Sequence, residues 1–576
     1  MTQARQQLDR RDFIKSIGLA TPLILSGFPG LASGEPVPAL SPVALAPRPQ
    51  EMAADLVVIG GGLGGCAAAL AAARNGLNVI LTEETDWIGG QWTAQAVPPD
   101  ENKWIETYGG TRSYQKLRQG VRDFYRRNYP LTAKARAEKY FNPGNCWVSR
   151  IGCEPRVALA VLYEMFAPYL GNGQVQILLN HRAVDAEYDG ATVKAIRVLS
   201  HDSGNELILR APFFADATEQ GDLLPLTKTE YVIGAEAQKD TTEPGAKPVA
   251  QPDNLQGFTA CFAMDYLAGE NHVLDQPRDY QYWRDLTLTT SAQKPYRFLS
   301  FDEDDSKRIG FDPVARKGYW TYRRIADRDQ FQPGFYHGDL TIVNWPQNDY
   351  SFGLICDVNA STAAKNLDRA KQLSLSLLYW LQTEAPRPDG GTGWPGLRLR
   401  PDIVGTQDGL AKYPYIREGR RLRAEFTVLE QHVRTDLRMQ ETGLKRDAVT
   451  AKKFEDSVGI GSYRMDLHLT TTGDRAKYGS TLPFQIPLGA LIPQRVENLL
   501  PACKNLGVTH LTNGCYRLHP VEWNIGEAVG ALTAFCSAQK KSPREVRNQP
   551  ALLKAFQKML QADGVRLDWP QEAGPV

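Results

Sequence analysis

The chain has 576 residues, of which 42% are hydrophobic and 23% charged, a composition typical of a folded globular protein rather than a disordered or collagen-like one. Its 66 Lys and Arg balance 65 Asp and Glu, which gives a formal net charge of +1. Such an even balance predicts no nucleic-acid partner and no electrostatic attraction to an anionic membrane. Eight cysteines in so long a chain exclude a scaffold built from disulfides.

The N-terminal residues 1–46 predict an export signal and a linker. Arg10 and Arg11 precede Phe13 and a short apolar stretch at 17–28, a pattern that resembles a twin-arginine export signal. The stretch is shorter than the roughly 20 apolar residues that span a bilayer, so we expect no stable membrane span. The twin-arginine machinery transports folded proteins. We therefore expect a periplasmic or secreted protein that loads any cofactor before export.

A dinucleotide-binding βαβ unit is predicted next. The apolar run at 55–59 predicts a buried parallel strand, the small residues at 67–74 predict a helix, and residues 78–82 predict a second strand. A unit of this kind places the start of its helix at the ends of the strands, where nucleotides bind.

Glycines in the first turn of this unit carry the nucleotide-binding pattern. Gly60, Gly62 and Gly65 form G-x-G-x-x-G directly after the first strand. The first glycine makes the tight turn, the second lets a pyrophosphate approach the backbone, and the third lets the helix pack on the strand. Glu83 closes the second strand and is expected to accept hydrogen bonds from ribose hydroxyls.

The residues after Glu83 favour FAD over NAD. Gly89 and Gly90 extend the motif as in flavoproteins that resemble the glutathione-reductase fold. Gln91 follows, and we expect it to lie against the flavin ring, where it binds the cofactor or positions a substrate. FAD is therefore the predicted cofactor, with Gly90 and Gln91 among its contacts.

A third stretch is expected to return to the same cofactor. A strand that ends near Phe214 leads into a segment that resembles the one returning to FAD in this fold. Its predicted cofactor contacts are Ala217, Thr218, Gly221 and Asp222.

The C-terminal part of the sequence predicts a short strand at 498–500 and a helix at 526–535. In related flavoproteins the start of this helix points at the flavin pyrimidine. Its dipole would stabilise negative charge on the reduced ring. Asn524 and Gly526 are therefore further predicted cofactor contacts.

Together these motifs resemble bacterial FAD-dependent oxidoreductases with a glutathione-reductase-type FAD domain. The resemblance also covers the segments 89–101, 146–162, 215–226, 387–402, 417–433 and 459–468. It implies FAD and redox chemistry, and it implies no particular substrate.

The resemblance implies an α/β fold with a discontinuous Rossmann-type FAD domain and an inserted α+β substrate domain. The expected FAD domain consists of 53–110, 145–230 and 480–540, the substrate domain of 231–475, and a C-terminal helical extension of 541–576. Within them, helices are expected at 101–142, 154–170, 363–384 and 548–563.

Three of the eight histidines are candidate general bases. His519 lies seven residues before the predicted helix at 526, on a segment expected to pass the flavin ring. His510 lies on the same approach, and His468 follows a possible strand with Arg464 and Asp466. For each of them, the alternative is a hydrogen-bonded structural role.

Arg417, Glu418 and Arg421 form a charged cluster with two readings. They could grip a substrate carboxylate or sugar hydroxyls, or they could form an internal ion-pair network. Cys146 and Cys153 are expected to be two packed thiols. No metal site is predicted, because no set of His and Cys has zinc or iron–sulfur spacing.

We therefore expect an exported FAD-dependent oxidoreductase that transfers a hydride or electrons between a small organic substrate and tightly bound FAD. An FAD-dependent reductase fed by an electron donor remains open, as does a secreted binding protein that keeps the fold without the chemistry. An electron donor or acceptor is thus a further expected partner. A covalent link to the flavin also remains open.

Overall fold

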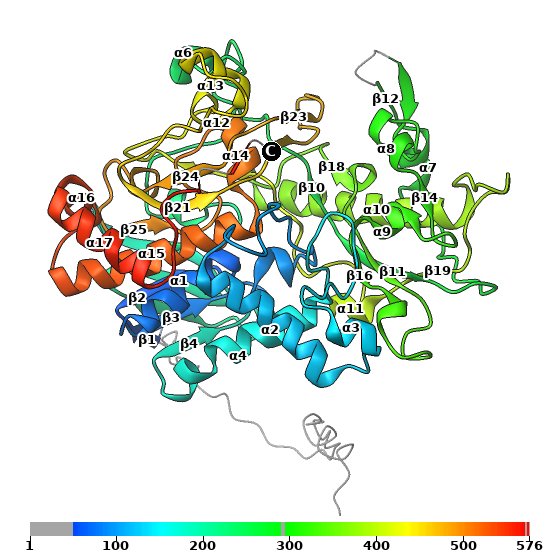
Figure 1. Ribbon diagram of the computed structural model, residues 1–576, viewed down its shortest axis with the longest axis horizontal. Helices are drawn as coiled ribbons and strands as arrows, with labels where there is room; N and C mark the ends of the chain where they lie inside the picture. Colours follow the sequence, from blue (N-terminus) through cyan, green and yellow to red (C-terminus); the bar gives the residue numbers. More distant parts are fainter. Residues whose placement is uncertain (1–49, 290–293, 571–572, 575–576) are drawn as a thin grey trace, which may run out of the picture. The chain divides into compact units, whose positions relative to one another are not determined.

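The computed structural model, which describes residues 50–289, 294–570 and 573–574, contains a five-stranded parallel sheet in the left part of the view in Figure 1. Its strands, in spatial order, are β25 (Leu499–Pro501), β8 (Phe213–Asp216), β2 (Leu56–Ile59), β3 (Val79–Thr82) and β4 (Val175–Leu178). All neighbouring pairs are parallel. Strands from the beginning, the middle and the end of the chain thus share one sheet. The predicted export signal lies outside the described residues.

Alternate residues of β2 face two different cores. Leu56 and Val58 belong to the core formed with the helices, whereas Val57 and Ile59 belong to a core shared with a second sheet. That second sheet has the order β1 (Gln50–Ala53), β7 (Glu206–Arg210), β6 (Thr192–Ser200) and β5 (His181–Asp189). Burial on both faces explains the unbroken apolar sequence of the central strands.

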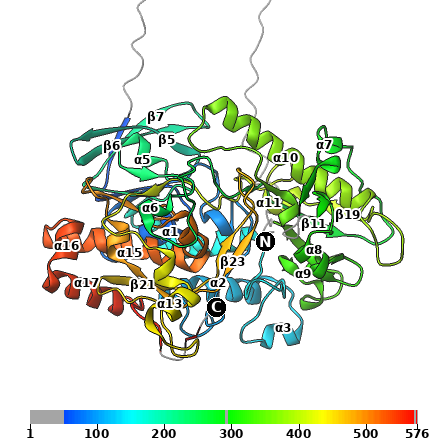
Figure 2. The ribbon, with the colours of Figure 1, turned by 90° about the horizontal axis from the view of Figure 1, so that it is seen from above.

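The helix α1 (Leu63–Arg74) packs closely on α15 (His519–Gln539), and both are visible near the parallel sheet in Figures 1 and 2. A Cβ atom on Gly526 would lie 1.9 Å from the carbonyl oxygen of Gly64, and one on Gly530 would lie 2.1 Å from that of Ala68. Glycines are therefore required where the two backbones meet.

Both of these helices begin earlier than predicted. The first starts at Leu63 rather than at 67, and the second at His519 rather than at 526. Pro520 occupies the first turn of α15, where a missing N–H costs nothing. The earlier start moves the end of the helix dipole to His519.

Other helices also differ at their ends. The predicted helix at 101–142 is instead α2 (Arg112–Asn128), capped by the Thr111 side chain, followed by the short α3 (Ala133–Ala137). The predicted terminal helix at 548–563 is α17 (Pro550–Ala562), close to its predicted bounds, and a further short helix, α16 (Pro543–Asn548), precedes it and ends before Pro550. The helices α4 (Pro155–Gly171) and α10 (Ala360–Thr383) lie close to their predicted bounds.

The chain between 231 and 475 builds a second core around an antiparallel sheet, drawn mainly in green in Figure 1. Its strands, in spatial order, are β16 (Arg324–Ala326), β17 (Leu340–Val343), β11 (Phe262–Tyr266) and β19 (Leu397–Leu399), and α10 packs against them. This part also returns to the rest of the fold through the pair β21 (Ser457–Gly461) and β24 (Phe484–Pro487).

Cys146 and Cys153 are buried free thiols. In the described part of the chain, no helix has both the length and the apolar character needed to cross a membrane.

Candidate active site

The turn between β2 and α1 exposes the N-terminus of the helix. Gly60 has a φ of +98°, and a Cβ atom there would lie 2.3 Å from the carbonyl oxygen of Ala217. A Cβ atom on Gly65 would lie 2.0 Å from the carbonyl oxygen of Gly60, so the third glycine of the motif serves helix packing, as predicted. Gly62 is the N-cap and has no side chain to cap the helix, and the only side chain found on the first-turn N–H groups of the described residues is Glu522, on Gly64. The N–H groups of this first turn and its helix dipole favour an anion.

A cavity of about 350 Å³ lies at this turn. Seven of the predicted cofactor contacts lie on its wall: Gly60, Gly62, Glu83, Gly90, Ala217, Thr218 and Asp222. Gln95, Tyr413 and Arg420 complete it on the far side. Such a concave site at the carboxyl ends of parallel strands is where nucleotides bind in this class of sheet.

Glu83 is held in place at one end of the cavity. Its Oε2 accepts a hydrogen bond from the Gly61 backbone at 3.0 Å, and its Oε1 accepts two from Thr85 at 2.8 Å. Burial raises the pKa of Glu83 to about 7, against the effect of these hydrogen bonds. The carboxylate is thus oriented by the backbone toward the place expected for a ribose.

Two predicted cofactor contacts lie elsewhere. Asn524 bonds to the backbones of Ile460 and Val458 at 3.1 and 3.4 Å and so ties α15 to β21. Gly526 lies at the crossing of α15 with α1. Both were expected at the start of the helix. Because the helix begins at His519, both residues lie inside it, and neither is on the wall of the cavity.

Gln91 and Gly221 support the site from behind the wall. The Gln91 amide donates to the carbonyl oxygen of Arg517 at 3.1 Å and also contacts Glu522, so it joins the turn at Gly90 to the start of α15. Gly221, with a φ of +68°, makes the turn that carries Thr218 and Asp222.

Buried polar atoms without a partner show that the residues here fit a large bound group. Such an atom costs about 1–3 kcal/mol if nothing satisfies it. Four such atoms come from the segments around the cavity: Trp92 Nε1, Gln95 Oε1 and Nε2, and Glu219 Oε1. FAD would fit here, held by the first turn of α1, Glu83 and residues 91–95.

One set of side chains that sequence reasoning missed could hold a metal ion. The ligand atoms of Glu219, Cys503 and Glu522 all lie within 4.8 Å of one another. Each carboxylate, however, already has a protein partner: Lys504 pairs with Glu219, and the Gly64 N–H donates to Glu522 at 3.0 Å. The second contact places an oxyanion on the N-terminus of α1, the position expected for a phosphate oxygen.

His519 does not have the lone pair that a general base needs. The Asp100 N–H donates to its Nδ1 at 3.3 Å, so Nε2 carries the proton and donates to the carbonyl oxygen of Val97 at 3.2 Å. The side chain is fully buried, and burial lowers its pKa to about 3. The geometry therefore corresponds to the alternative reading, a structural histidine that joins α15 to the segment at 97–100.

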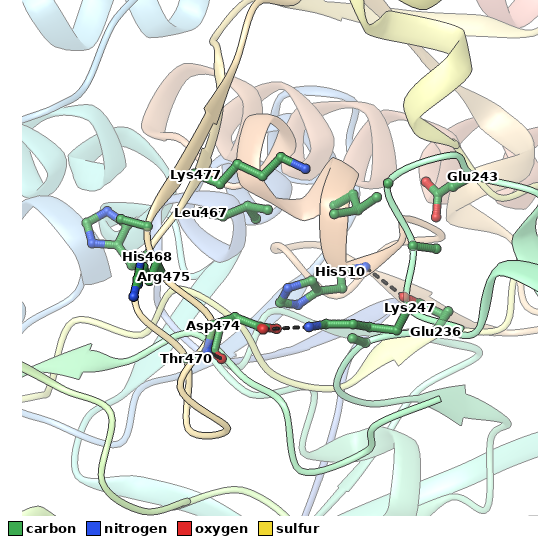
Figure 3. Close-up of a pocket in the computed structure, with 15 residues that line it drawn as sticks. Glu236, Glu243, Lys247, Leu467, His468, Thr470, Asp474, Arg475, Lys477 and His510 are labelled. Atoms are coloured by element: carbon green, nitrogen blue, oxygen red, sulfur yellow. Dashed lines mark hydrogen bonds and ion pairs between the residues drawn. The ribbon is translucent and has the colours of Figure 1, made fainter. Parts of the chain in front are cut away.

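His510 has the geometry of a proton-transfer group. Its Nδ1 lies 2.9 and 3.0 Å from the two carboxylate oxygens of Glu418. Burial opposes a charge on the ring, but the Glu418 carboxylate raises the pKa of His510 overall. The ring lines a cavity of about 390 Å³ and points into it (Figure 3).

His468 lines the same cavity and lies between two carboxylates. Its Nδ1 is 2.6 Å from Asp349 and its Nε2 is 3.3 Å from Asp466. Gln256 joins the two histidines, because its amide contacts Glu418 at 3.4 Å and accepts a hydrogen bond from the His468 backbone at 3.1 Å. His468 and His510 therefore belong to one polar network.

The charged cluster at 417–421 is part of this network. Arg417 pairs with Asp349 at 2.9 Å, and Arg421 pairs with Glu418 and with Glu236, the latter at 2.8 Å. These ion pairs support the reading of the cluster as internal, with Glu418 orienting His510. No local sequence motif predicts the contact between Glu418 and His510, because the two residues are 92 positions apart in the sequence.

Arg323 and Asp100 were also missed from the sequence. The Arg323 guanidinium forms two hydrogen bonds of 3.1 Å with Asp100, and both side chains are buried. Asp100 lies ten residues after Gly90, which is on the wall of the cavity. The backbone N–H of Asp100 also donates to His519.

Comparison with known proteins gives a family and distant structural neighbours. The family model described as FAD dependent oxidoreductase matches residues 55–560. The search of curated proteins finds no match. Among solved structures, the chain is similar to L-proline dehydrogenase from P. horikoshii (16% identity, TM-score 0.18, 33% of this chain and 25% of that chain). It is also similar to quinol fumarate reductase FrdA from E. coli (10%, 0.31, 89% and 74%) and to p-nitrophenol 4-monooxygenase PnpA from Pseudomonas putida DLL-E4 (14%, 0.22, 38% and 48%).

The chain therefore covers about a quarter of the first of these structures and about three quarters of the second. Because the family match extends over most of the sequence, the protein belongs to the FAD dependent oxidoreductase family: it is an FAD-dependent oxidoreductase, and its cofactor is FAD.

Proposed function

We propose that this oxidoreductase exchanges a hydride or electrons with a small organic substrate, and that His510 transfers the accompanying proton. The observation that carries the proposal is the pair of His510 and Glu418 on the wall of the 390 Å³ cavity. FAD, when bound, supplies the two-electron chemistry. The protein supplies the proton-transfer group and orients it.

Glu418 determines what His510 can do. By binding Nδ1 it fixes the ring and directs Nε2 toward the cavity, where a substrate hydroxyl, amine or carbonyl could reach it. Arg421 and Gln256 in turn hold the carboxylate. His468 faces the same cavity but has a carboxylate at each ring nitrogen, so it is a positioning residue in this proposal.

The raised pKa of His510 favours a second candidate, a reductase fed by an electron donor. A ring whose pKa is raised by the Glu418 carboxylate holds its proton to higher pH than a free histidine does, and it can donate that proton to a substrate that is being reduced. The two directions predict opposite pH profiles. Substrate reduction should slow as the pH rises through the pKa of His510, whereas substrate oxidation should speed up.

The test is a substrate screen followed by two matched variants. In the oxidative direction, substrate bleaches the flavin absorbance under nitrogen; in the reductive direction, substrate restores it after dithionite reduction. We expect His510→Ala to keep FAD and to slow this step about 10²- to 10⁴-fold. His432→Ala, at a histidine stacked on Phe426 and packed edge-on against Phe454, is the control and should keep the normal rate. An unchanged rate in His510→Ala would refute the role.

We also propose that the protein is exported through the twin-arginine route and that 53–110, 145–230 and 480–540 form the FAD domain around a substrate domain at 231–475. The parallel sheet, with strands from all three stretches, supports the second statement. Replacing Arg10 and Arg11 by Lys should leave FAD-loaded protein in the cytoplasm. Unchanged periplasmic recovery would contradict the export proposal.

A further inference from the structure

Next to the polar network lies a buried group of hydrogen-bond donors that no described residue satisfies. The guanidinium of Arg323 uses both terminal nitrogens on Asp100, and its Nε has no partner. Arg517 donates from Nη2 to the backbone and side chain of Asp466, both at 3.1 Å, and its Nε has no partner either. The two arginines are 6% and 2% exposed.

Tyr415 lies among these arginines. Its hydroxyl is buried and has no partner among the described residues. Burial raises the pKa of Tyr415 to about 12, and the nearby charges of Arg517, Arg323 and Arg417 oppose that rise. The Arg417 guanidinium lies over the tyrosine ring at 5.2 Å. One hydroxyl thus lies in the field of three guanidiniums.

A fourth donor comes from the same helix end. Asn513 lies in α14 (His510–Tyr516), one turn before Arg517, and its Nδ2 has no partner among the described residues. Its Oδ1 accepts from Gln256 at 3.3 Å, which fixes the amide with the nitrogen free. Four buried donor groups therefore have no acceptor among the described residues: the Nε atoms of Arg323 and Arg517, the Tyr415 hydroxyl and the Asn513 amide nitrogen.

We propose that these four donors form a site for the carboxylate of the substrate, so that the enzyme acts on a small carboxylic acid. A carboxylate has two oxygens with about four acceptor positions, which equals the number of donors, and arginine is the side chain best matched to it. Asp100 and Asp466 already neutralise part of the cationic charge, which suits a singly charged anion better than a phosphate dianion.

The site is connected to the proposed chemistry. Asp466 binds both Arg517 and His468, and His468 is on the wall of the cavity that His510 faces. A substrate anchored by its carboxylate at Arg517 would thus extend toward the histidines. The inference rests on the proposed function, because it assumes that the substrate reaches His510.

The test uses FAD-loaded protein and the sodium salts of formate, acetate, oxalate and benzoate, with sodium chloride at equal ionic strength as the reference. We expect at least one carboxylate to change the flavin absorbance spectrum in a saturable way and to raise the melting temperature. Tyr415→Phe should weaken its binding about 10-fold or more while retaining FAD, because it removes one hydrogen bond to a charged group.

Tyr516→Phe is the matched control. Its hydroxyl is also buried but donates to the carbonyl oxygen of Gln485 at 2.7 Å, so carboxylate binding should stay unchanged. Arg517→Lys, which keeps the charge but removes Nε, should weaken binding as Tyr415→Phe does. The inference is wrong if no carboxylate binds, or if both variants bind it normally.

The two proposals fail in different ways. If no carboxylate binds but His510→Ala still slows turnover of an uncharged substrate, only the carboxylate site is wrong. If carboxylates bind as expected but His510→Ala turns over normally, only the role of His510 is wrong.

Discussion

The two halves of the active site are built by different means. The cofactor cavity depends largely on backbone that is local in the sequence: glycines at a turn, the first turn of α1, and a glutamate that accepts hydrogen bonds from the N–H groups of Gly61 and Thr85. The proposed substrate side is a network of side chains paired over long distances in the sequence, such as Glu418 with His510 and Asp100 with Arg323. A backbone site depends on a few local residues, whereas a side-chain network depends on every element that carries one of its members.

The largest expected effect separates glycines that serve the fold from those that serve the cofactor. Gly526→Val would force a branched side chain into the carbonyl of Gly64, so we expect insoluble or unfolded protein. A Cβ atom on Gly62 would meet the side chains of Glu219 and Glu522 at 3.2 and 3.3 Å, and the backbone oxygen of Ala217 at an ordinary contact distance of 3.7 Å. Gly62→Val should therefore fold but lose FAD, as measured by circular dichroism and flavin absorbance. If the Gly62→Val protein still contained FAD, the distinction between glycines needed for folding and glycines needed for FAD binding would be wrong.

A smaller effect concerns the buried histidine that joins the halves. The pKa of His519 is about 3 in the folded protein, well below its ordinary value, because burial disfavours the charge. The neutral ring therefore adds stability above pH 6.5, and this stability is lost as the pH falls toward 3. Between pH 6.5 and 4 the loss should reach about 3 kcal/mol in the free energy of unfolding.

His519→Gln should remove that part of the pH dependence. Denaturant unfolding of both proteins from pH 7 to pH 4 measures it as the difference between the two curves. A difference that does not change with pH would mean that the pKa of His519 is the same in the folded and the unfolded protein, as for an exposed ring, and it would return this residue to the candidates for proton transfer.

The smallest expected effect concerns Glu83 and tests whether its carboxylate contributes to FAD binding. Glu83→Gln keeps the shape of the side chain but removes the charge that a ribose hydroxyl would meet. We expect FAD affinity to fall about 10-fold, the cost of weakening one charge-assisted hydrogen bond, with little change in the fold. Equilibrium dialysis of FAD with apo-protein measures this, and Asp86→Asn, at a nearby carboxylate that pairs with Lys412 and is not on the wall of the cavity, is the control. An equal loss of FAD affinity in both variants would mean that the loss of any nearby negative charge weakens FAD binding, without a specific hydrogen bond to Glu83.

The sequence by itself predicted the nucleotide-binding unit well. The spacing of Gly60, Gly62, Gly65 and Glu83 is a local pattern. It could be recognised in the sequence because the turn, the start of the helix and the end of the next strand lie within one short βαβ unit. The same holds for the strand and turn that carry Ala217 and Thr218. In these segments, neighbours in the sequence are also neighbours in the site.

Only the tertiary structure decided the rest. The start of α15 at His519 moved Asn524 and Gly526 inside the helix, and the contacts of His519 with Asp100 and Val97 removed it from the candidate bases. His510 became the better candidate because Glu418, distant in sequence, binds its ring. The protonation and orientation of a side chain depend on its partners in space, and those partners are known only once the whole chain has packed.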